Sequence, residues 1–270
     1  MDYLRQILGN GNGQPGPVRL DRAALELASI HFPGLTAEPF LDRLNEMACS
    51  LGDRLRNFND GRDFVEKAEL YLFGELGFHG NETDFFDPLN SCLNQVLERR
   101  TGIPITLSVM YMEIARRLRM PVYGIGLPRH FVLEFNDGNY STFIDPFHGG
   151  CRITPRDCYA LAGSQVADPS LLRRVTPKQI VMRMLQNLDR VYMRQRNFAK
   201  SVATLDLMIF GAPETAAWYK RRGLLSLELG RYHSAQNDLR HYLALEPEAS
   251  DRPEIVRQMT SIHHWMARVS

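Results

Sequence analysis

His130 and Asp145 are the residues of this 270-residue chain whose types and spacing best suit proton-transfer chemistry. Short strands are predicted at 122–125, 130–135 and 140–145, and the Asp-Gly turn at 136–139 joins the last two into a hairpin. His130 opens the second strand and Asp145 closes the third, so the hairpin should bring them close together. A carboxylate beside an imidazole fixes the tautomer of the ring, as in many general bases.

A predicted helix precedes these strands and begins at Pro104. Proline suits the first position of a helix, and Met120-Pro121 is a stop signal at the other end. A shorter helix is predicted just before it, through Leu93 and Leu97. The buried side of the longer helix should carry apolar residues at helical spacing, namely Leu107, Met110, Tyr111, Ile114, Ala115 and Leu118. These elements predict an α+β core over residues 89–170.

The composition of the chain excludes several classes of function. Lys and Arg number 32 against 31 Asp and Glu, so no global field attracts nucleic acid or an anionic membrane. No run of 18 apolar residues predicts a membrane span. The four cysteines lack CxxC spacing, which favours reduced thiols and a cytoplasmic location. They are Cys49, Cys92, Cys151 and Cys158.

The first 88 residues carry no visible chemistry. Residues 1–17 are expected to be a flexible segment, because 9–17 contain only Gly, Asn, Gln and Pro. A helical subdomain is predicted over 18–88. Asp21 is expected to cap its first helix, a second helix should follow Thr36, and a third should end near Gly74 or Gly77.

The last ninety residues repeat with a period of 34. Pro213 and Pro247 are 34 residues apart, and so are Phe198 and Tyr232. Two helical repeats are expected at 182–213 and 216–247, with a capping helix at 252–268 whose apolar residues include Ile255, Met259, Ile262 and Met266. His263 and His264 in that helix are interpreted as a solvated pair.

The second repeat resembles the tetratricopeptide pattern. It has Gly223, Gly230, Tyr232, Ala235, Leu239 and Pro247 at the positions where that pattern expects them. The first repeat departs from the pattern, because Asp189 stands where the small glycine would be and Ser201 where the alanine would be. The predicted tetratricopeptide-like tail spans 178–268.

The central motifs carry a second resemblance. The run RRTGIPITLSVMYMEIARRLRMPVYGIGLPRHFVLEF, followed by FIDPFHGG, is similar to the transglutaminase-like domain of bacterial SirB-type regulators. Those proteins also have a helical segment before the domain and a tetratricopeptide-like tail after it. The resemblance implies a transglutaminase-like, papain-like core with a small antiparallel sheet, and a regulatory role in bacteria.

The resemblance also implies a catalytic cysteine that this chain lacks. The superfamily places the thiol at the start of a helix, where the helix dipole and a histidine stabilise the thiolate. Counted back from Arg119-Met120-Pro121, that position falls on or beside Pro104. Proline offers neither a nucleophile nor an N–H for an oxyanion. We therefore expect thiol acyl transfer to be absent, with His130 and Asp145 as a remnant dyad.

Other residues could replace the missing thiol or bind a ligand. Thr106 and Ser108 lie in the first turns of the helix, where capping and packing are the favoured roles. Cys92 is expected to be a core thiol, and the glycine-flanked Cys151 is the more accessible one. The cleft could also have been reassigned to a peptide or small molecule, with Arg129 and His130 as polar contacts.

Asp145, His148 and Cys151 are spaced by three, and His130 is expected nearby, so these side chains are candidates for a metal site. These residues lack the paired spacing of structural zinc sites, and their Pro and Gly neighbours indicate turns. We expect neither a metal nor another cofactor.

The favoured function is a non-catalytic regulatory protein that binds a protein or peptide through its tail. The tail could instead pack on the core and only stabilise it. The alternative is a hydrolase or acyltransferase that uses His130 and Asp145 with a displaced nucleophile, either Cys151, Thr106 or Ser108.

Overall fold

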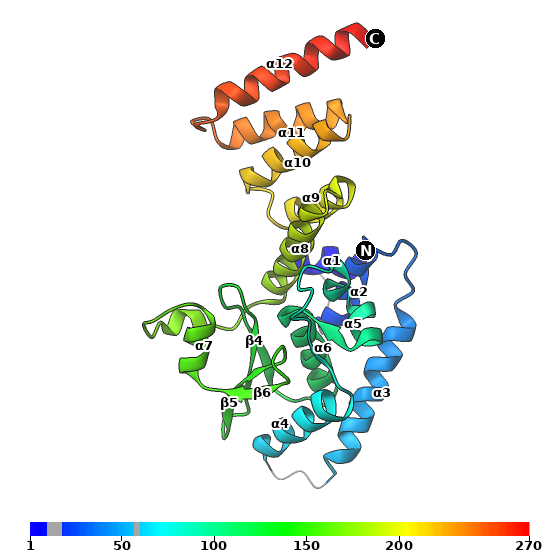
Figure 1. The fold of residues 1–270 in the computed structure, drawn as a ribbon, viewed down its shortest axis with the longest axis vertical. Helices are drawn as coiled ribbons and strands as arrows, with labels where there is room; N and C mark the ends of the chain where they lie inside the picture. Colours follow the sequence, from blue (N-terminus) through cyan, green and yellow to red (C-terminus); the bar gives the residue numbers. More distant parts are fainter. Residues whose placement is uncertain (10–17, 57–59, 270) are drawn as a thin grey trace. The chain divides into compact units, whose positions relative to one another are not determined.

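The computed structural model describes residues 1–9, 18–56 and 60–269, with side chains to residue 261. The chain forms two compact units, and α8 (Pro177–Arg194) passes from one into the other (Figure 1). The first unit comprises Met1–Ile7 and Gly13–Met184, and the second comprises Leu8–Asn12 and Leu185–Ser270. The predicted helical subdomain and the predicted core thus belong to the same unit.

The N-terminal part of the first unit is helical. Its elements are α1 (Asp2–Leu8), α2 (Leu20–Ala28), α3 (Glu38–Arg54), α4 (Gly61–Glu69) and a π-helix at Leu70–Glu75. The helix α1 corrects the expectation of a flexible segment over 1–17: the amides of Tyr3 and Leu4 donate to the carboxylate of Glu26 at 3.2 and 2.7 Å. Residues 10–17, which include most of the Gly-rich run, lie outside the described residues.

Asp21 has a different role from the predicted cap. The residue before α2 is Arg19, and Asp21 lies inside the helix with its side chain fully buried. Its carboxylate accepts from Arg117 at 2.6 Å and from Arg19 at 3.0 Å. Burial raises the pKa of Asp21, but these two guanidinium groups outweigh it and lower the pKa to about 2. Asp21 therefore links α2 electrostatically to α6 (Pro104–Arg117), the helix that Arg117 ends.

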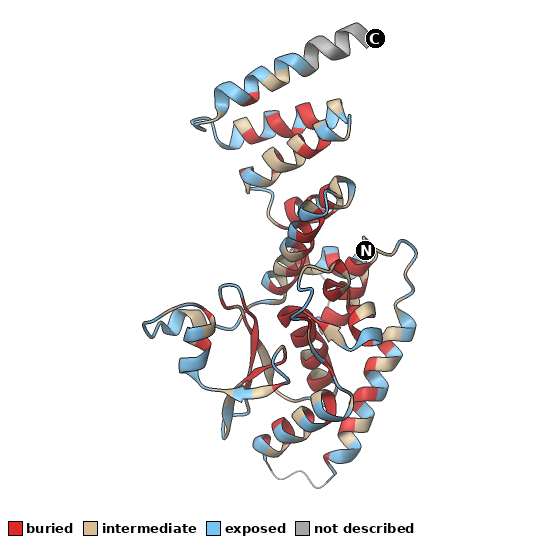
Figure 2. Ribbon diagram, in the orientation of Figure 1, coloured by how far each residue is buried: buried red, intermediate tan, exposed pale blue. Residues whose placement is uncertain are grey.

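The helix α6 (Pro104–Arg117) is the centre of the first unit. It packs against α2, α3 and α5 (Leu93–Arg99) and also against β3. Nearly every residue from Pro104 to Ala115 is buried, as the continuous red ribbon of α6 shows (Figure 2). The predicted start at Pro104 is confirmed, since proline occupies the first turn.

A four-stranded antiparallel sheet lies beside α6, in the order β3-β4-β5-β6 (Figure 1). Its strands are β3 (Val122–Ile125), β4 (Val132–Asn136), β5 (Ser141–Asp145) and β6 (Cys151–Ile153). The predicted hairpin is confirmed, with Asn136 opposite Ser141 and Gly138 at a φ of +92°. β4 begins at Val132, so His130 lies just before the strand rather than in it.

Several short elements were not predicted. A parallel pair joins β1 (His79–Gly80) to β2 (Thr101–Gly102), just ahead of α6. β6 and α7 (Pro155–Leu161) follow the core hairpin. Two 3-10 helices lie at Pro88–Ser91 and Pro169–Leu172. Elements of two to seven residues are too short to leave a periodic apolar pattern.

The tail consists of helices at the predicted repeat positions. After α8 come α9 (Phe198–Gly211), α10 (Ala216–Glu228), α11 (Tyr232–Leu245) and α12 (Arg252–Val269). From α9 onward each helix contacts the next. The side chains of Ile262, His263, His264 and Met266 lie outside the described residues.

Candidate functional site

The predicted pair of His130 and Asp145 forms a direct hydrogen bond. Asp145 is the last residue of β5. His130 lies two residues before the start of β4, the strand that pairs with β5. The Nε2 atom of His130 lies 2.8 Å from Oδ2 of Asp145. Both residues are buried, at 8% and 1% exposure. The imidazole is therefore oriented as a general base would be, with Nδ1 as the ring nitrogen left for a second partner.

A third side chain, His148, joins this pair. Its Nδ1 lies 2.8 Å from the same Oδ2 atom of Asp145. The rings of the two histidines stack with centroids 5.6 Å apart and planes 28° apart. His148 differs from His130 in exposure, since 46% of its side chain is accessible against 10%. The sequence-derived site omitted His148, although its spacing three residues after Asp145 was a signal.

Asp145 is held as a carboxylate by its neighbours. Its Oδ1 atom accepts from the backbone N–H of Phe147 at 3.0 Å and of His148 at 3.4 Å. Burial raises the pKa of Asp145, but the hydrogen bonds and charges of His130 and His148 outweigh burial and lower the pKa. The ionised form is thus favoured in the folded protein.

The backbone around His130 is also fixed. Its carbonyl accepts from Nη2 of Arg183 at 2.7 Å, and its N–H donates to the carbonyl of Leu127 at 3.3 Å. Arg129, a predicted cleft contact, has a left-handed φ of +62° and an exposed side chain whose guanidinium lies against Gly163. Within the described residues Arg129 makes no hydrogen bond to the His–Asp pair.

The candidate hydroxyls on α6 are both buried. Thr106 donates from Oγ1 to the carbonyl of Asn90 at 2.7 Å and accepts the N–H of Ile103 at 3.2 Å, so it serves the start of the helix. Ser108 is fully buried, and its hydroxyl has no partner among the described residues. Neither hydroxyl hydrogen-bonds to His130.

Neither candidate thiol is a favourable nucleophile: the pKa of Cys151 is raised, and Cys92 is buried. Cys151 lies opposite Asp145 across β5 and β6. Burial raises the pKa of the Cys151 thiol, and the negative charge of Asp145 raises it further. Cys92 is fully buried, and its thiol donates to the carbonyl of Pro88 at 3.4 Å. A raised pKa reduces the population of the thiolate that would act as nucleophile.

A cavity of about 410 Å³ adjoins the exposed edge of this cluster. One side is Phe147, His148 and Gly149, and the other is the segment 79–83. The two sides are joined by a hydrogen bond from the N–H of Gly80 to the carbonyl of Phe147, at 3.1 Å. His148 therefore connects the buried carboxylate of Asp145 to a space open to a ligand.

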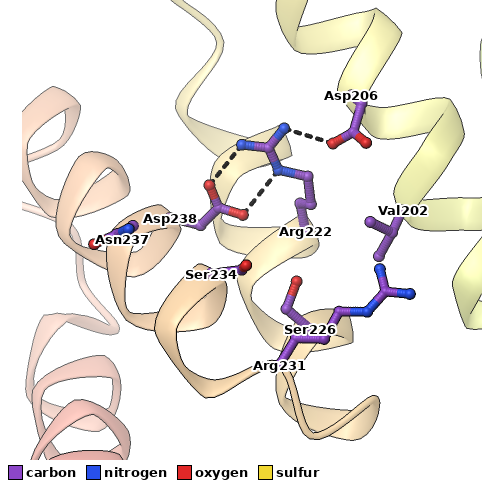
Figure 3. Close-up of a pocket in the computed structure, with 8 residues that line it drawn as sticks. All are labelled: Val202, Asp206, Arg222, Ser226, Arg231, Ser234, Asn237 and Asp238. Carbon is purple, nitrogen blue, oxygen red and sulfur yellow. Dashed lines mark hydrogen bonds and ion pairs between the residues drawn. The ribbon is translucent and has the colours of Figure 1, made fainter.

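The tail carries a separate polar pocket of about 360 Å³ between α9, α10 and α11 (Figure 3). Arg222 crosses it with a bidentate bond to Asp238 at 2.6 and 2.8 Å and a third bond to Asp206 at 2.7 Å. Arg231 and the buried Ser226 also line the pocket. Within the described residues, no ion pair engages the guanidinium of Arg231.

Comparison with known proteins finds a matching family model for each of the two units. Residues 38–186 match the family model for the transglutaminase-like superfamily, which is more than half of the chain. The chain belongs to the transglutaminase-like superfamily. Residues 188–260 match a tetratricopeptide repeat model, so the transglutaminase-like domain is followed by a helical repeat region, as the sequence predicted. The predicted α+β class is likewise confirmed.

The similar relatives come from bacteria and animals. A UPF0162 protein of Xylella fastidiosa is 36% identical over 232 residues, which cover 83% of each chain. A UPF0162 protein of Pseudomonas aeruginosa is 27% identical over 87% of this chain and 88% of its own. Human F-box only protein 21 is 37% identical over 64% of this chain and 31% of its own. No solved structure matches.

The described helices do not include one that is both long enough and apolar enough to cross a membrane.

Proposed function

We propose that this protein is a non-catalytic member of its superfamily that acts as a regulatory interaction protein. The observation that carries the proposal is the environment of His130: within the described residues, its ring hydrogen-bonds only to Asp145. Pro104 begins α6, and the resemblance to the superfamily assigns the thiol to a position on or beside it. A dyad without a nucleophile in reach cannot begin covalent acyl transfer.

Retention of the dyad has a structural explanation in this proposal. The bonds from Asp145 to His130 and His148 tie the end of β5 to the residue before β4 and to the following turn. Each such bond to a charged group contributes roughly 1.5–3 kcal/mol. The pair thus stabilises the sheet whether or not it takes part in a reaction.

The tail supplies the binding surface in this proposal. Tetratricopeptide repeats generally mediate protein–protein interaction, and the match over 188–260 supports that role. The pocket between α9, α10 and α11 offers the guanidinium of Arg231 beside polar side chains, and the part of the chain that the structure describes holds no ion pair to it. We take this pocket as the part of the tail to test first.

The test of partner binding uses the full chain with matched variants. Arg231→Glu reverses the charge that lines the pocket, and Arg240→Glu is the control, because Arg240 is exposed on α11 outside the pocket. A protein captured from bacterial extract should be retained by wild type, Arg240→Glu and His148→Ala, and weakened at least tenfold by Arg231→Glu. Equal loss with both arginine variants, or loss with His148→Ala alone, would contradict binding through the tail pocket.

The second candidate is a hydrolase or acyltransferase with a displaced nucleophile. It is favoured by one observation, the oriented imidazole of His130 with Nδ1 free for a second partner. Treatment of the native protein with a probe that acylates reactive cysteine thiols distinguishes the two candidate functions. The proposal expects labelling at the exposed Cys49 and none at Cys151. Rapid labelling of Cys151 that His130→Ala abolishes would establish the enzyme instead.

A further inference from the structure

We propose that His130, Asp145 and His148 form a binding site for a divalent first-row transition metal ion such as Zn²⁺. One donor atom from each side chain lies within 4.8 Å of the other two. The three residues come from separate places in the fold: the approach to β4, the end of β5 and the turn after it. Their convergence is a property of the fold and not of a sequence motif.

Two of the three distances between the donor atoms are close to those of a coordination sphere, and the two ring nitrogens lie within 4.8 Å of each other. Nε2 of His130 and Nδ1 of His148 are each 2.8 Å from Oδ2 of Asp145. In a tetrahedral zinc site with bonds of about 2.0–2.2 Å, donor atoms lie roughly 3.3 Å apart. Each N–O distance has to widen by only about 0.5 Å to admit the ion.

Each imidazole has a ring nitrogen that could ligate a metal ion. In the hydrogen-bonded form, Nε2 of His130 and Nδ1 of His148 point their protons at the acceptor Oδ2. When a metal ion takes that place, each proton moves to the other nitrogen of the same ring. Asp145 already favours the ionised form, which is the form that ligates.

The groups around the ligands hold them in place, as the outer shell of a metal site does. Oδ1 of Asp145 is occupied by the N–H groups of Phe147 and His148, which leaves Oδ2 as a single ligand atom. The carbonyl of His130 is held by Arg183. Two ligands are thus fixed before any ion binds, and His148 closes the set from the accessible side.

The donor set selects the kind of ion. Two imidazoles and one carboxylate suit Zn²⁺ and its first-row neighbours, whereas Mg²⁺ and Ca²⁺ prefer oxygen ligands. Three protein ligands leave a coordination position open, and one of the three, His148, also lines the cavity. The sequence predicts no metal at Asp145, His148 and Cys151, because these residues lack the paired spacing of a structural zinc site and their neighbours indicate turns. Among the described residues, the convergent group contains His130 in place of Cys151.

The test is metal binding by the full chain after treatment with a chelator. Titration with Zn²⁺ should give one high-affinity site in wild type, and His148→Ala should weaken it at least about 100-fold, because even outer-shell changes cost 10–100-fold. Co²⁺ should give visible d–d bands without a thiolate charge-transfer band, since no cysteine belongs to the group. Zn²⁺ should raise the melting temperature of wild type and not that of His148→Ala.

Two control variants make the result specific. His79→Ala removes an exposed histidine that lines the same cavity, and Cys151→Ser removes the nearby thiol. Both should bind Zn²⁺ like wild type. The proposal is overturned if wild type has no site, if His148→Ala binds as tightly as wild type, or if the Co²⁺ complex has a thiolate band that Cys151→Ser removes.

Discussion

Asp145 in the first unit and Asp189 in the second are both buried carboxyls, yet their pKa values shift in opposite directions. Asp145 is 1% exposed and Asp189 is 2% exposed. Burial is the largest influence on each and raises both pKa values. Two imidazoles reverse that effect at Asp145, whereas one hydroxyl from Ser201 and the half-exposed Arg221 do not reverse it at Asp189. Burial alone therefore does not decide the charge state.

The two carboxyls make opposite contributions to stability as the pH changes. The pKa of Asp145 is below its ordinary value of 3.8, so its contribution is present above that pH and is lost as the pH falls through the folded-state pKa. The pKa of Asp189 is above 3.8, so the folded state binds the proton more tightly than the unfolded state. Protonation of Asp189 therefore favours folding as the pH falls toward 3.8.

The repeat explains why Asp189 exists at all. The equivalent positions in the second repeat, 34 residues later, are Gly223 for Asp189 and Ala235 for Ser201. A Cβ on Gly223 would lie 3.0 Å from the side chain of Leu239, so a larger residue there would require Leu239 to shift. In the first repeat the two departures from the pattern hydrogen-bond to each other. A polar pair thus occupies the two positions where the tetratricopeptide pattern has small residues.

The chain provides separate probes for its two units. Both tryptophans, Trp218 and Trp265, belong to the second unit, so tryptophan fluorescence reports on the tail. All four cysteines belong to the first unit, and Cys92 and Cys158 are buried. Thiol labelling in urea therefore reports on the unfolding of the first unit. The comparison between the two aspartates can be tested within one protein.

The largest expected effect is that of Asp145→Ala. The substitution leaves the buried ring of His130 without its partner and frees two backbone N–H groups. The free energy of unfolding of the first unit should fall by about 2–4 kcal/mol at pH 7. Labelling of Cys92 should shift to lower urea, while the fluorescence transition of the tail stays in place. A change below about 0.5 kcal/mol would contradict the role given to the carboxylate.

The next effect is that of Ser201→Ala, which restores the residue type of the second repeat at one position only. Asp189 loses its hydroxyl donor and keeps only the ion pair with Arg221 at 3.0 Å. The second unit should lose about 1–2 kcal/mol, measured by tryptophan fluorescence in urea. Ser234→Ala on the exposed part of α11 is the matched control and should stay within about 0.5 kcal/mol.

The smallest effect is that of Asp189→Asn. Unlike Asp145→Ala, this substitution is not expected to lower the free energy of unfolding. The amide keeps an acceptor for Ser201 and removes a buried charge, so stability at pH 7 should be unchanged or higher by up to about 1 kcal/mol. The variant should also lack the gain in stability that wild type shows as the pH falls toward 3.8. A clear loss of stability at pH 7 would mean that the ion pair with Arg221 dominates.

The sequence predicted the large elements well because they carry long periodic signals. The start of α6 at Pro104 and the repeat helices followed from capping residues and a period of 34. The cap at Asp21 was wrong, because its ion pair with Arg117 joins residues 96 positions apart and leaves no local pattern. The sequence did not predict β6 for a related reason. Its three residues are too few to show a periodic pattern, and they pair with β5 only when the turn before them forms.

The site was predicted in part. The bond between His130 and Asp145 followed from the hairpin, whose turn fixes which residues face one another. The place of His148 depends on the turn at 145–148, where Asp145 bonds to two following N–H groups and thereby rotates the histidine toward itself. The interpretation of Thr106 as a capping residue agrees with its bond to Ile103. The finer resemblance to SirB-type regulators stays a prediction.

Pro104 also contributes to the stability of the fold. Its ring fixes φ at the first turn of α6, where the missing N–H costs nothing. Exchange of proline for cysteine there would widen the conformational freedom of the unfolded chain and cost about 0.4–1 kcal/mol of folding stability. Folding stability alone therefore favours proline over cysteine at the start of α6.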